Sequence, residues 1–369
     1  MKYWSINYKF LILLVIVLSA CKDLPPVASQ PSGLNVLEFL PPLAGFQQVD
    51  EVELDTPDLH DAHPAQRVEL WASTFWLQDE TGQLVSGQLA ILRLALAAEH
   101  SEDSARRSHW VTQQLYSAKL SLTYATQQWQ AERTARAALG LAGASQRGVW
   151  LEQWRLGFPQ KSEPFQLHAK ADDFALSLSG KAPLEPQQLT LLPGLTNSPL
   201  GYVQAPIAAT GVLNIENVDH SVSGQLWFDH VWGNGLPVGR GQLGLVQLRV
   251  LLNNGIHLQC LQLRRRSGGG VPIGGCTVFN LAVEGISLDR HSLQLHPLPA
   301  VTQSGLPLHW LLESTVLQLS LKIKAETAAG TGNRFTSAQP ATVEGTYADN
   351  EVSGQAWLEL SGLSDVPKS

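Results

Sequence analysis

Residues 223–233 read SGQLWFDHVWG, and this stretch decides the fold class and contains the candidate site. Its residues alternate in character, as on a β-strand, where successive side chains point to opposite faces of the sheet. An acid beside a tryptophan on one face is unusual for a core and typical of the wall of a pocket with a polar floor. One face is predicted to carry Gln225, Trp227, Asp229 and Val231, and the other Leu226, Phe228, His230 and Trp232.

The same alternation recurs along the chain between turns rich in Gly, Asn, Asp and Pro. Many short strands at this spacing indicate a β-sandwich or barrel. Residues 130–141, rich in Ala, Arg and Glu and followed by Gly143, predict a helix. We therefore expect an all-β protein with one or two short helices. The other strand-like segments are residues 83–94, 115–124, 165–178, 212–232, 245–252, 317–323 and 355–360.

The N-terminus has the form of an export signal, residues 1–20, with nine consecutive apolar residues at 10–18. This run is too short to cross a bilayer, which needs about 20 apolar residues. Residues 18–21, LSAC, resemble a bacterial lipobox, in which Cys21 is acylated and becomes the new N-terminus; an ordinary signal peptide with a chance cysteine is the alternative. Lys22 follows and favours sorting to the outer membrane. We expect a lipid-anchored protein of the bacterial cell envelope, facing the periplasm.

The mature chain is predicted to be acidic and to have two domains. The full chain has 25 basic and 32 acidic residues, so removing the two lysines of the signal leaves 23 basic residues and a formal charge of −9. Only residues 264–266 (RRR) form a basic run, so nucleic acid is not an expected partner. Residues 21–35 form a Pro- and Ser-rich flexible linker. The remaining length of about 335 residues exceeds a single core.

Cys260 and Cys276 are predicted to form a disulfide. Their midpoint is Gly268, inside a run of three glycines, so a hairpin of residues 256–266 and 271–280 would place them opposite each other. Opposed residues of antiparallel strands have Cα atoms about 4.5–5.5 Å apart, which a disulfide can span. In an exported protein the bond would persist. Two reduced core cysteines are the alternative.

Residues 223–233 also resemble the W-x-D-H-E-W segment of the carotenoid 1,2-hydratase (hydroxyneurosporene synthase) family and its AttH-like secreted relatives. The resemblance covers most of the mature chain. It implies two lipocalin-like antiparallel β-barrels, which we place at residues 36–212 and 213–369, and a barrel of about eight strands can hold one small ligand. The other matching segments, in the order of the family, are His60-x-x-His63-Pro64 with Glu69, Glu132-Arg133-x-x-Arg136 with residues 140–143 (GLAG), Tyr202 with Pro206, residues 343–345 (VEG) and residues 359–362 (ELSG).

The resemblance implies hydration of an isolated double bond, which needs a proton donor, a water and an apolar cavity. Asp229, kept protonated by apolar neighbours, is the expected donor, with His230 beside it. Glu69 and Glu344 are expected to approach the same cavity. Alternatively, Asp229 and His230 form a structural pair that ties the strand to a loop. The residues expected to contact a ligand are Trp71, Tyr202, Trp227 and Trp232.

Several positions depart from the family pattern. Val231 replaces the glutamate that follows Asp-His, residues 69–72 read ELWA in place of E-W-W-Y, and residues 342–345 read TVEG, without the tyrosine and tryptophan. Lys119 stands where the family usually has an alanine-histidine pair. These losses fit a binding protein on an inherited scaffold, or an enzyme with altered chemistry.

Other chemistry has weaker support. Asp58, His60, Asp61 and His63 could chelate a divalent metal, but a solvated loop explains them as well, so no metal is expected. The chain has no G-x-S-x-G elbow, phosphate loop or dinucleotide fingerprint, so no cofactor is expected.

Three functions remain open on the sequence. The favoured one is a membrane-anchored lipocalin-like lipoprotein that binds an apolar molecule such as a lipid, isoprenoid or secondary metabolite. The second is a hydro-lyase or hydrolase with Asp229 as general acid. The third is an accessory subunit of an ABC-type exporter. A continuous apolar cavity that reaches Asp229 would support the first two, and a barrel filled by side chains the third.

Overall fold

The computed structural model describes residues 45–49, 51–56, 58–98, 112–158, 163–181, 185–195, 197–235, 243–265, 271–280, 283–299, 307–325 and 336–361. Every regular element in these ranges is a β-strand, and the strands form one twelve-stranded and one nine-stranded sheet. The expected signal, Cys21 and the linker lie outside the described residues. Among the described residues, no helix is long and apolar enough to span a membrane.

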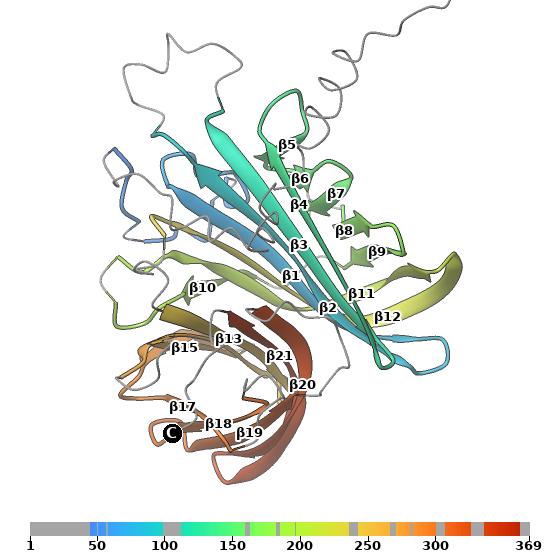
Figure 1. Cartoon of the computed structure of the whole chain (residues 1–369). Coiled ribbons are helices and arrows are strands. Elements are labelled where there is room, and N and C mark those ends of the chain that lie inside the picture. The colour runs from blue at the N-terminus through green and yellow to red at the C-terminus, as the bar shows by residue number, and fades with distance from the viewer. Residues whose placement is uncertain are drawn as a thin grey trace, which may run out of the picture. The chain divides into compact units, whose positions relative to one another are not determined.

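The twelve-stranded sheet runs in the order β4-β3-β2-β1-β12-β11-β9-β8-β7-β6-β5, with β10 paired to β11. Contacts from β2, β3 and β4 to β6 bring its two halves together over an apolar core, so that the sheet forms a half-barrel (Figure 1). Its strands are β1 (Val68–Asp79), β2 (Leu84–Ala95), β3 (Gln114–Tyr124), β4 (Gln127–Arg136), β5 (Ala142–Ser145), β6 (Gly148–Leu151), β7 (Trp154–Gly157), β8 (Phe165–Lys170), β9 (Phe174–Gly180), β10 (Gln187–Thr190), β11 (Leu200–Ile215) and β12 (Val218–Gly233).

The nine-stranded sheet runs in the order β16-β15-β14-β13-β21-β20-β19-β18-β17 and curls into a nearly closed barrel (Figure 1). β14 pairs with β15 in the register that sets Cys260 opposite Cys276, and the two cysteines form a disulfide with a Cα–Cα distance of 4.0 Å. The glycine run expected to turn this hairpin lies outside the described residues. The strands are β13 (Leu243–Leu252), β14 (Ile256–Arg265), β15 (Ile273–Asn280), β16 (Val283–Asp289), β17 (Gln294–Pro297), β18 (His309–Ser314), β19 (Leu319–Ala325), β20 (Thr336–Tyr347) and β21 (Asn350–Ser361).

The helix predicted at residues 130–141 is wrong. Most of this segment belongs to β4, which pairs along its whole length with β3. Exposed residues alternate with partly buried ones along β4, and Trp129, Ala131 and Ala135 pack against the core. Strand pairing and this period-2 burial outweigh the helix propensity of its Ala, Glu and Arg residues.

The chain passes from one sheet to the other between Gly233, the end of β12, and Leu243, the start of β13. The expected domain boundary between residues 212 and 213 falls inside β11, which continues in the twelve-stranded sheet to Ile215. β12 pairs with β11 along nearly its whole length and with β1 from Val222 to Gly233, so residues 223–233 belong to the first sheet.

The two sheets share a buried junction. Apolar side chains from both sheets form one cluster, which includes Trp227 of β12 and Trp357 of β21. The indole Nε1 of Trp76 donates to the carbonyl of Ala356 across it, at 3.4 Å. One face of β12 therefore packs on the nine-stranded sheet, and the other faces the core of its own sheet.

Candidate functional site

Three titratable side chains meet on the inner face of the twelve-stranded sheet. β1 supplies Glu69 and β12 supplies His230, while His63 comes from the segment before β1. The Oε1 atom of Glu69 lies 2.8 Å from Nδ1 of His63 and 2.8 Å from Nε2 of His230. Glu69 and His230 are fully buried, whereas the His63 side chain is 24% exposed. We call these three residues the His-Glu-His cluster.

Arg93 of β2 holds the cluster in place through hydrogen bonds. Its Nε donates to Oε2 of Glu69 at 2.8 Å, and its Nη2 donates to the carbonyls of His63 and Gln66. The backbone N–H of His63 also donates to the Glu69 carboxylate. Burial raises the pKa of Glu69, but hydrogen bonds from His230 and His63, and the charge of Arg93, lower it by more. The net pKa therefore lies well below its usual range, and Glu69 is a carboxylate.

Aromatic rings enclose His230. It stacks on Trp71 with ring centroids 4.9 Å apart and contacts Trp232 at 4.8 Å and the edge of Tyr202 at 5.4 Å. Burial lowers its pKa to about 4, against the opposing effect of Glu69, so the ring is neutral at pH 7. Three of the four expected ligand-contact residues, Trp71, Tyr202 and Trp232, thus gather around His230.

A second pair lies beside the cluster. The Tyr202 hydroxyl is 2.5 Å from Nδ1 of His60, and the His60 ring stacks on Phe158 at 5.2 Å. Burial lowers the pKa of His60 to about 4 and raises the pKa of Tyr202 well above its ordinary value. Tyr202 is therefore a neutral phenol, and both partners are uncharged at pH 7.

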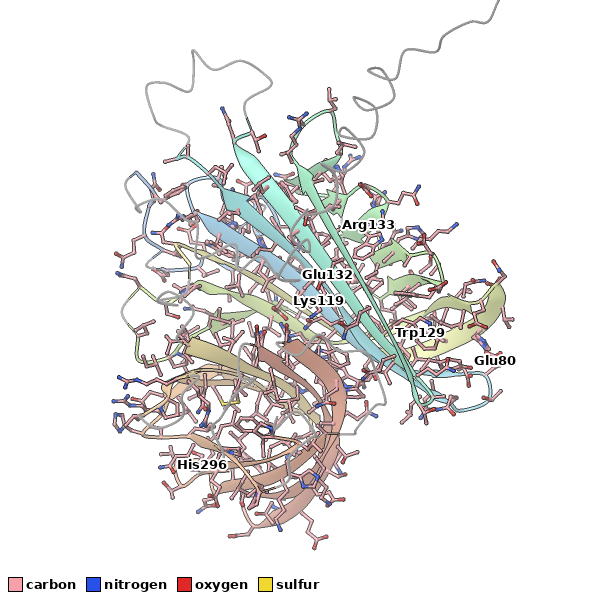
Figure 2. The ribbon with its side chains drawn as sticks, viewed as in Figure 1. Glu80, Lys119, Trp129, Glu132, Arg133 and His296 are labelled. Carbon is pink, nitrogen blue, oxygen red and sulfur yellow. A yellow bond between two sulfur atoms is a disulfide. The ribbon has the colours of Figure 1, made fainter. Side chains whose placement is uncertain are left out.

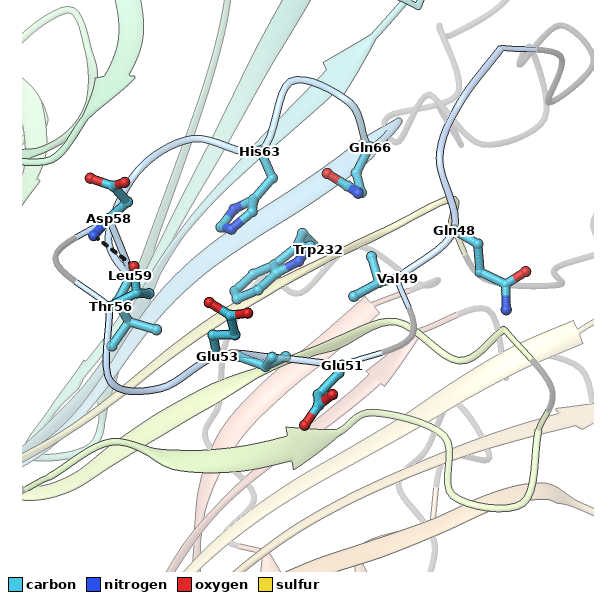
Figure 3. A pocket seen from close by; sticks show the side chains of 11 residues that line it. Gln48, Val49, Glu51, Glu53, Thr56, Asp58, Leu59, His63, Gln66 and Trp232 are labelled. Atoms are coloured by element: carbon cyan, nitrogen blue, oxygen red, sulfur yellow. Dashed lines mark hydrogen bonds between the residues drawn. The ribbon is translucent and has the colours of Figure 1, made fainter.

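A pocket of about 310 Å³ ends at this site (Figure 3). His63 and Trp232 form part of its wall, and their rings stack with centroids 3.7 Å apart and planes inclined by 6°. His63 therefore connects the pocket to the buried Glu69. The other lining residues are Gln48, Val49, Glu51, Val52, Glu53, Thr56, Asp58, Leu59 and Gln66.

Asp229 does not belong to this site. The predicted alternation of faces is correct: Leu226, Phe228 and Trp232 lie in the core of the twelve-stranded sheet, whereas Trp227 and Val231 lie in the junction. Asp229 points into the junction, where Nε and Nη2 of Arg249 donate to its two oxygens at 2.8 and 3.0 Å. Both oxygens of Asp229 are therefore bonded to Arg249 in the junction, away from the His-Glu-His cluster. Trp227, the fourth expected ligand contact, lies in the junction as well.

Glu344 does not lie at the site where it was expected. It lies on β20 of the nine-stranded sheet, with a side chain 63% exposed, and accepts a hydrogen bond from Lys324 at 2.7 Å. Of the three carboxylates expected to converge, only Glu69 lies at the inner site.

The four side chains that the sequence offered as a possible metal chelate bond to different partners. Asp58 and Asp61 both accept hydrogen bonds from the side chain of Gln146. His60 bonds Tyr202 and His63 bonds Glu69, so the four side chains do not form one metal site. Sequence reasoning missed Arg93 and Arg249, whose only signal was a charge within a mostly apolar strand.

The E-R-x-x-R and G-L-A-G segments are structural. Arg133 lies over the Trp154 ring at 4.9 Å and donates to Glu152 and to the carbonyl of Lys170, which joins β4 to the opposite half of the sheet (Figure 2). Lys119 stands opposite Glu132 on the neighbouring strand. Gly143 lies against the Trp150 ring, where a Cβ would come within 2.6 Å of a ring atom.

Fold and site together define a two-sheet, lipocalin-like β-protein with a polar cluster at the end of a pocket. The AttH-like family model matches residues 47–363, and the chain belongs to this family. A crystal structure of an AttH from Nitrosomonas europaea has a TM-score of 0.70 and 19% identity, covering 87% of this chain and 100% of that one. Comparison with the curated proteins gives no match.

Two further solved structures share the fold. Kievitone hydratase from Nectria haematococca has a TM-score of 0.59 and 10% identity, covering 89% of this chain and 98% of that one. CghA with Sch210972 has a TM-score of 0.52 and 13% identity, covering 88% of this chain and 100% of that one. The family match confirms the predicted resemblance, and the solved structures confirm the lipocalin-like all-β fold.

Proposed function

We propose that this protein binds a small, partly apolar molecule in the pocket that ends at His63 and Trp232. The observation that carries this is the composition of the pocket. An indole face and the apolar side chains of Val49, Val52 and Leu59 form its apolar part, and the other seven lining residues are polar or charged. In ligand pockets the apolar surface supplies contact area and the polar groups orient the ligand, so this lining suits a molecule with both apolar and polar parts. The CghA structure, on the same fold, was determined with Sch210972.

Binding of a neutral aromatic probe tests this proposal. N-phenyl-1-naphthylamine should bind the purified protein, and Trp232→Ala should weaken its affinity about tenfold, equivalent to about 1.4 kcal/mol of lost contact. Trp129→Ala is the matched control, because Trp129 lies on β4 and does not line the pocket. Native mass spectrometry of gently extracted protein would show a natural ligand directly. An affinity that Trp232→Ala leaves unchanged, with no bound molecule detected, would overturn the proposal.

Hydratase activity on the bound molecule is the second candidate. It is favoured by the position of the His-Glu-His cluster next to the pocket and by the fold shared with kievitone hydratase. Asp229 is not part of this candidate, since it points to the opposite face of β12. Incorporation of ¹⁸O from labelled water into a ligand identified by mass spectrometry would test it.

The cellular setting that we propose rests on the sequence. Acylation of Cys21 would anchor the protein in the bacterial envelope, facing the periplasm, with the outer membrane favoured by Lys22. There it could present its ligand to an ABC-type exporter, the partner suggested by the family resemblance. Crosslinking in intact cells, followed by identification of the captured membrane proteins, would test the partner.

A further inference from the structure

The His-Glu-His cluster has the composition and spacing of a metal site. Its three ligand atoms all lie within 4.8 Å of one another, and Oε1 of Glu69 is 2.8 Å from each histidine nitrogen. Ligands bound tetrahedrally to one zinc ion at about 2.0–2.2 Å would be about 3.3 Å apart. The two distances from Glu69 to the histidine nitrogens therefore need to lengthen by only about 0.5 Å to admit an ion.

The contacts around the cluster hold these ligand atoms in place. Arg93 occupies the other carboxylate oxygen of Glu69, so Oε1 remains directed at the two imidazoles. His63 is held against Trp232 and His230 against Trp71. In metal sites, residues that contact the metal ligands in this way orient those ligands and tune the affinity for the metal.

His230 supplies an independent observation. It is completely buried, and its Nδ1 has no hydrogen-bond partner among the described residues. Its Nε2, the nitrogen that faces the cluster, is hydrogen-bonded to Glu69. Nε2 is therefore the nitrogen that can serve as a ligand, and the proton would then reside on Nδ1.

The pocket gives an ion access and favourable charge. Glu51, Glu53 and Asp58 line it, and none of its described lining residues is a lysine or an arginine. These carboxylates draw cations inward and offset the charge of Arg93. Because His63 lies in the pocket wall, an ion bound to it would have one side toward the pocket. Three protein ligands and one open position define the catalytic type of zinc site.

We propose that His63, Glu69 and His230 bind a divalent transition metal, zinc or a similar first-row ion, with one coordination position open to the pocket. This inference goes beyond the binding function proposed above and does not depend on it. Two imidazoles and one carboxylate suit such ions better than they suit magnesium or calcium.

A second His-carboxylate group in the chain serves as a control. Asp79, Glu80 and His220 also come within ligand distance of one another. However, Oδ1 of Asp79 accepts three hydrogen bonds from Thr81 and Gln83, and Oδ2 accepts one from Tyr124. These bonds stabilise the turn after β1, so both carboxylate oxygens of Asp79 already have partners other than a metal.

Cobalt binding tests the site. The full chain, made without a histidine tag and stripped with EDTA, should bind one Co²⁺ with visible d–d absorption, and Zn²⁺ should displace it. His63→Ala should weaken Co²⁺ binding about a hundredfold or more, whereas His220→Ala should leave it unchanged. His63 is partly exposed, so its variant is the one best suited to keep the fold; Glu69→Gln and His230→Gln follow where they fold.

Two results would overturn the metal proposal. One is the absence of Co²⁺ and Zn²⁺ binding at micromolar concentrations, and the other is equal Co²⁺ affinity in wild type and His63→Ala. The naphthylamine assay, run on the EDTA-treated protein, separates this outcome from the binding function. Probe binding without metal binding would leave the pocket proposal intact.

Discussion

The buried pair of Asp229 and Arg249 joins the two sheets, and breaking it should destabilise the protein strongly. Two hydrogen bonds of 2.8 and 3.0 Å connect the groups, and their side chains are 0% and 1% exposed. Arg249→Met keeps most of the side-chain volume and removes the guanidinium. The carboxylate of Asp229 is then left buried and unpaired.

The expected magnitude follows from that unpaired charge. Removing one partner of a buried ion pair typically costs about 3–5 kcal/mol of unfolding free energy. Total stability of a domain is about 5–15 kcal/mol, so Arg249→Met should lose about a fifth or more of it. Asp229→Asn should also destabilise, because it leaves Arg249 without its counter-charge. Neither change should alter ligand binding in the pocket, which lies on the other face of β12.

Urea unfolding measures the free energy of unfolding. It should be applied to wild type, to both single variants and to the double variant Asp229→Leu/Arg249→Met. The double variant removes both charges and should be within about 2 kcal/mol of wild type, far from the sum of the single effects. If Arg249→Met lies within about 1 kcal/mol of wild type, the pair does not hold the junction. If Asp229→Asn instead abolishes ligand binding while stability is unchanged, Asp229 has the functional role that the sequence suggested.

Four further outcomes are expected. Native protein should resist alkylation at Cys260 and Cys276 until it is reduced, and the Cys260→Ala/Cys276→Ala protein should lose about 3 kcal/mol for the 16-residue separation; ready alkylation before reduction would contradict the bond. Cys21→Ser should release the protein into the soluble periplasmic fraction or leave it unprocessed, and continued anchoring of a processed form would refute the lipobox. Glu344→Gln should leave both stability and ligand binding unchanged, because its partner contact is exposed, whereas a loss of binding would restore Glu344 to the site. Burial lowers the pKa of His257 below 6.5, so the unfolded chain takes up a proton that the folded chain does not, and stability falls as pH drops below 6.5; His257→Phe should make this fall shallower, measured by urea unfolding at several pH values.

The sequence predicted those features that depend on local pattern. The alternation in residues 223–233 correctly separated the face of Trp227 and Asp229 from the face of Phe228 and His230, because side-chain direction on a strand is set by position alone. The spacing of the two cysteines about a glycine run predicted their pairing, since hairpin register is fixed by the turn. Ordered motifs predicted the family and hence the fold.

The partners of buried charges could not be predicted. Arg93 meets Glu69 because β1 and β2 pair in register, but Arg249 reaches Asp229 across two sheets from strands that do not pair. A single sequence contains no signal for such a contact. The false helix at residues 130–141 has a similar origin, since pairing with β3 is a tertiary property that local propensity does not include.

The two faces of β12 therefore have different roles, and the Asp-His motif contributes one residue to each face. On the inner face His230 completes the His-Glu-His cluster with Glu69, and on the outer face Asp229 fixes the junction through Arg249. Val231 lies on the outer face, so the loss of the family's glutamate at this position changes the junction and leaves the inner site untouched. Because Val231 lies in the junction and not at the pocket, Val231→Glu should affect stability rather than ligand binding.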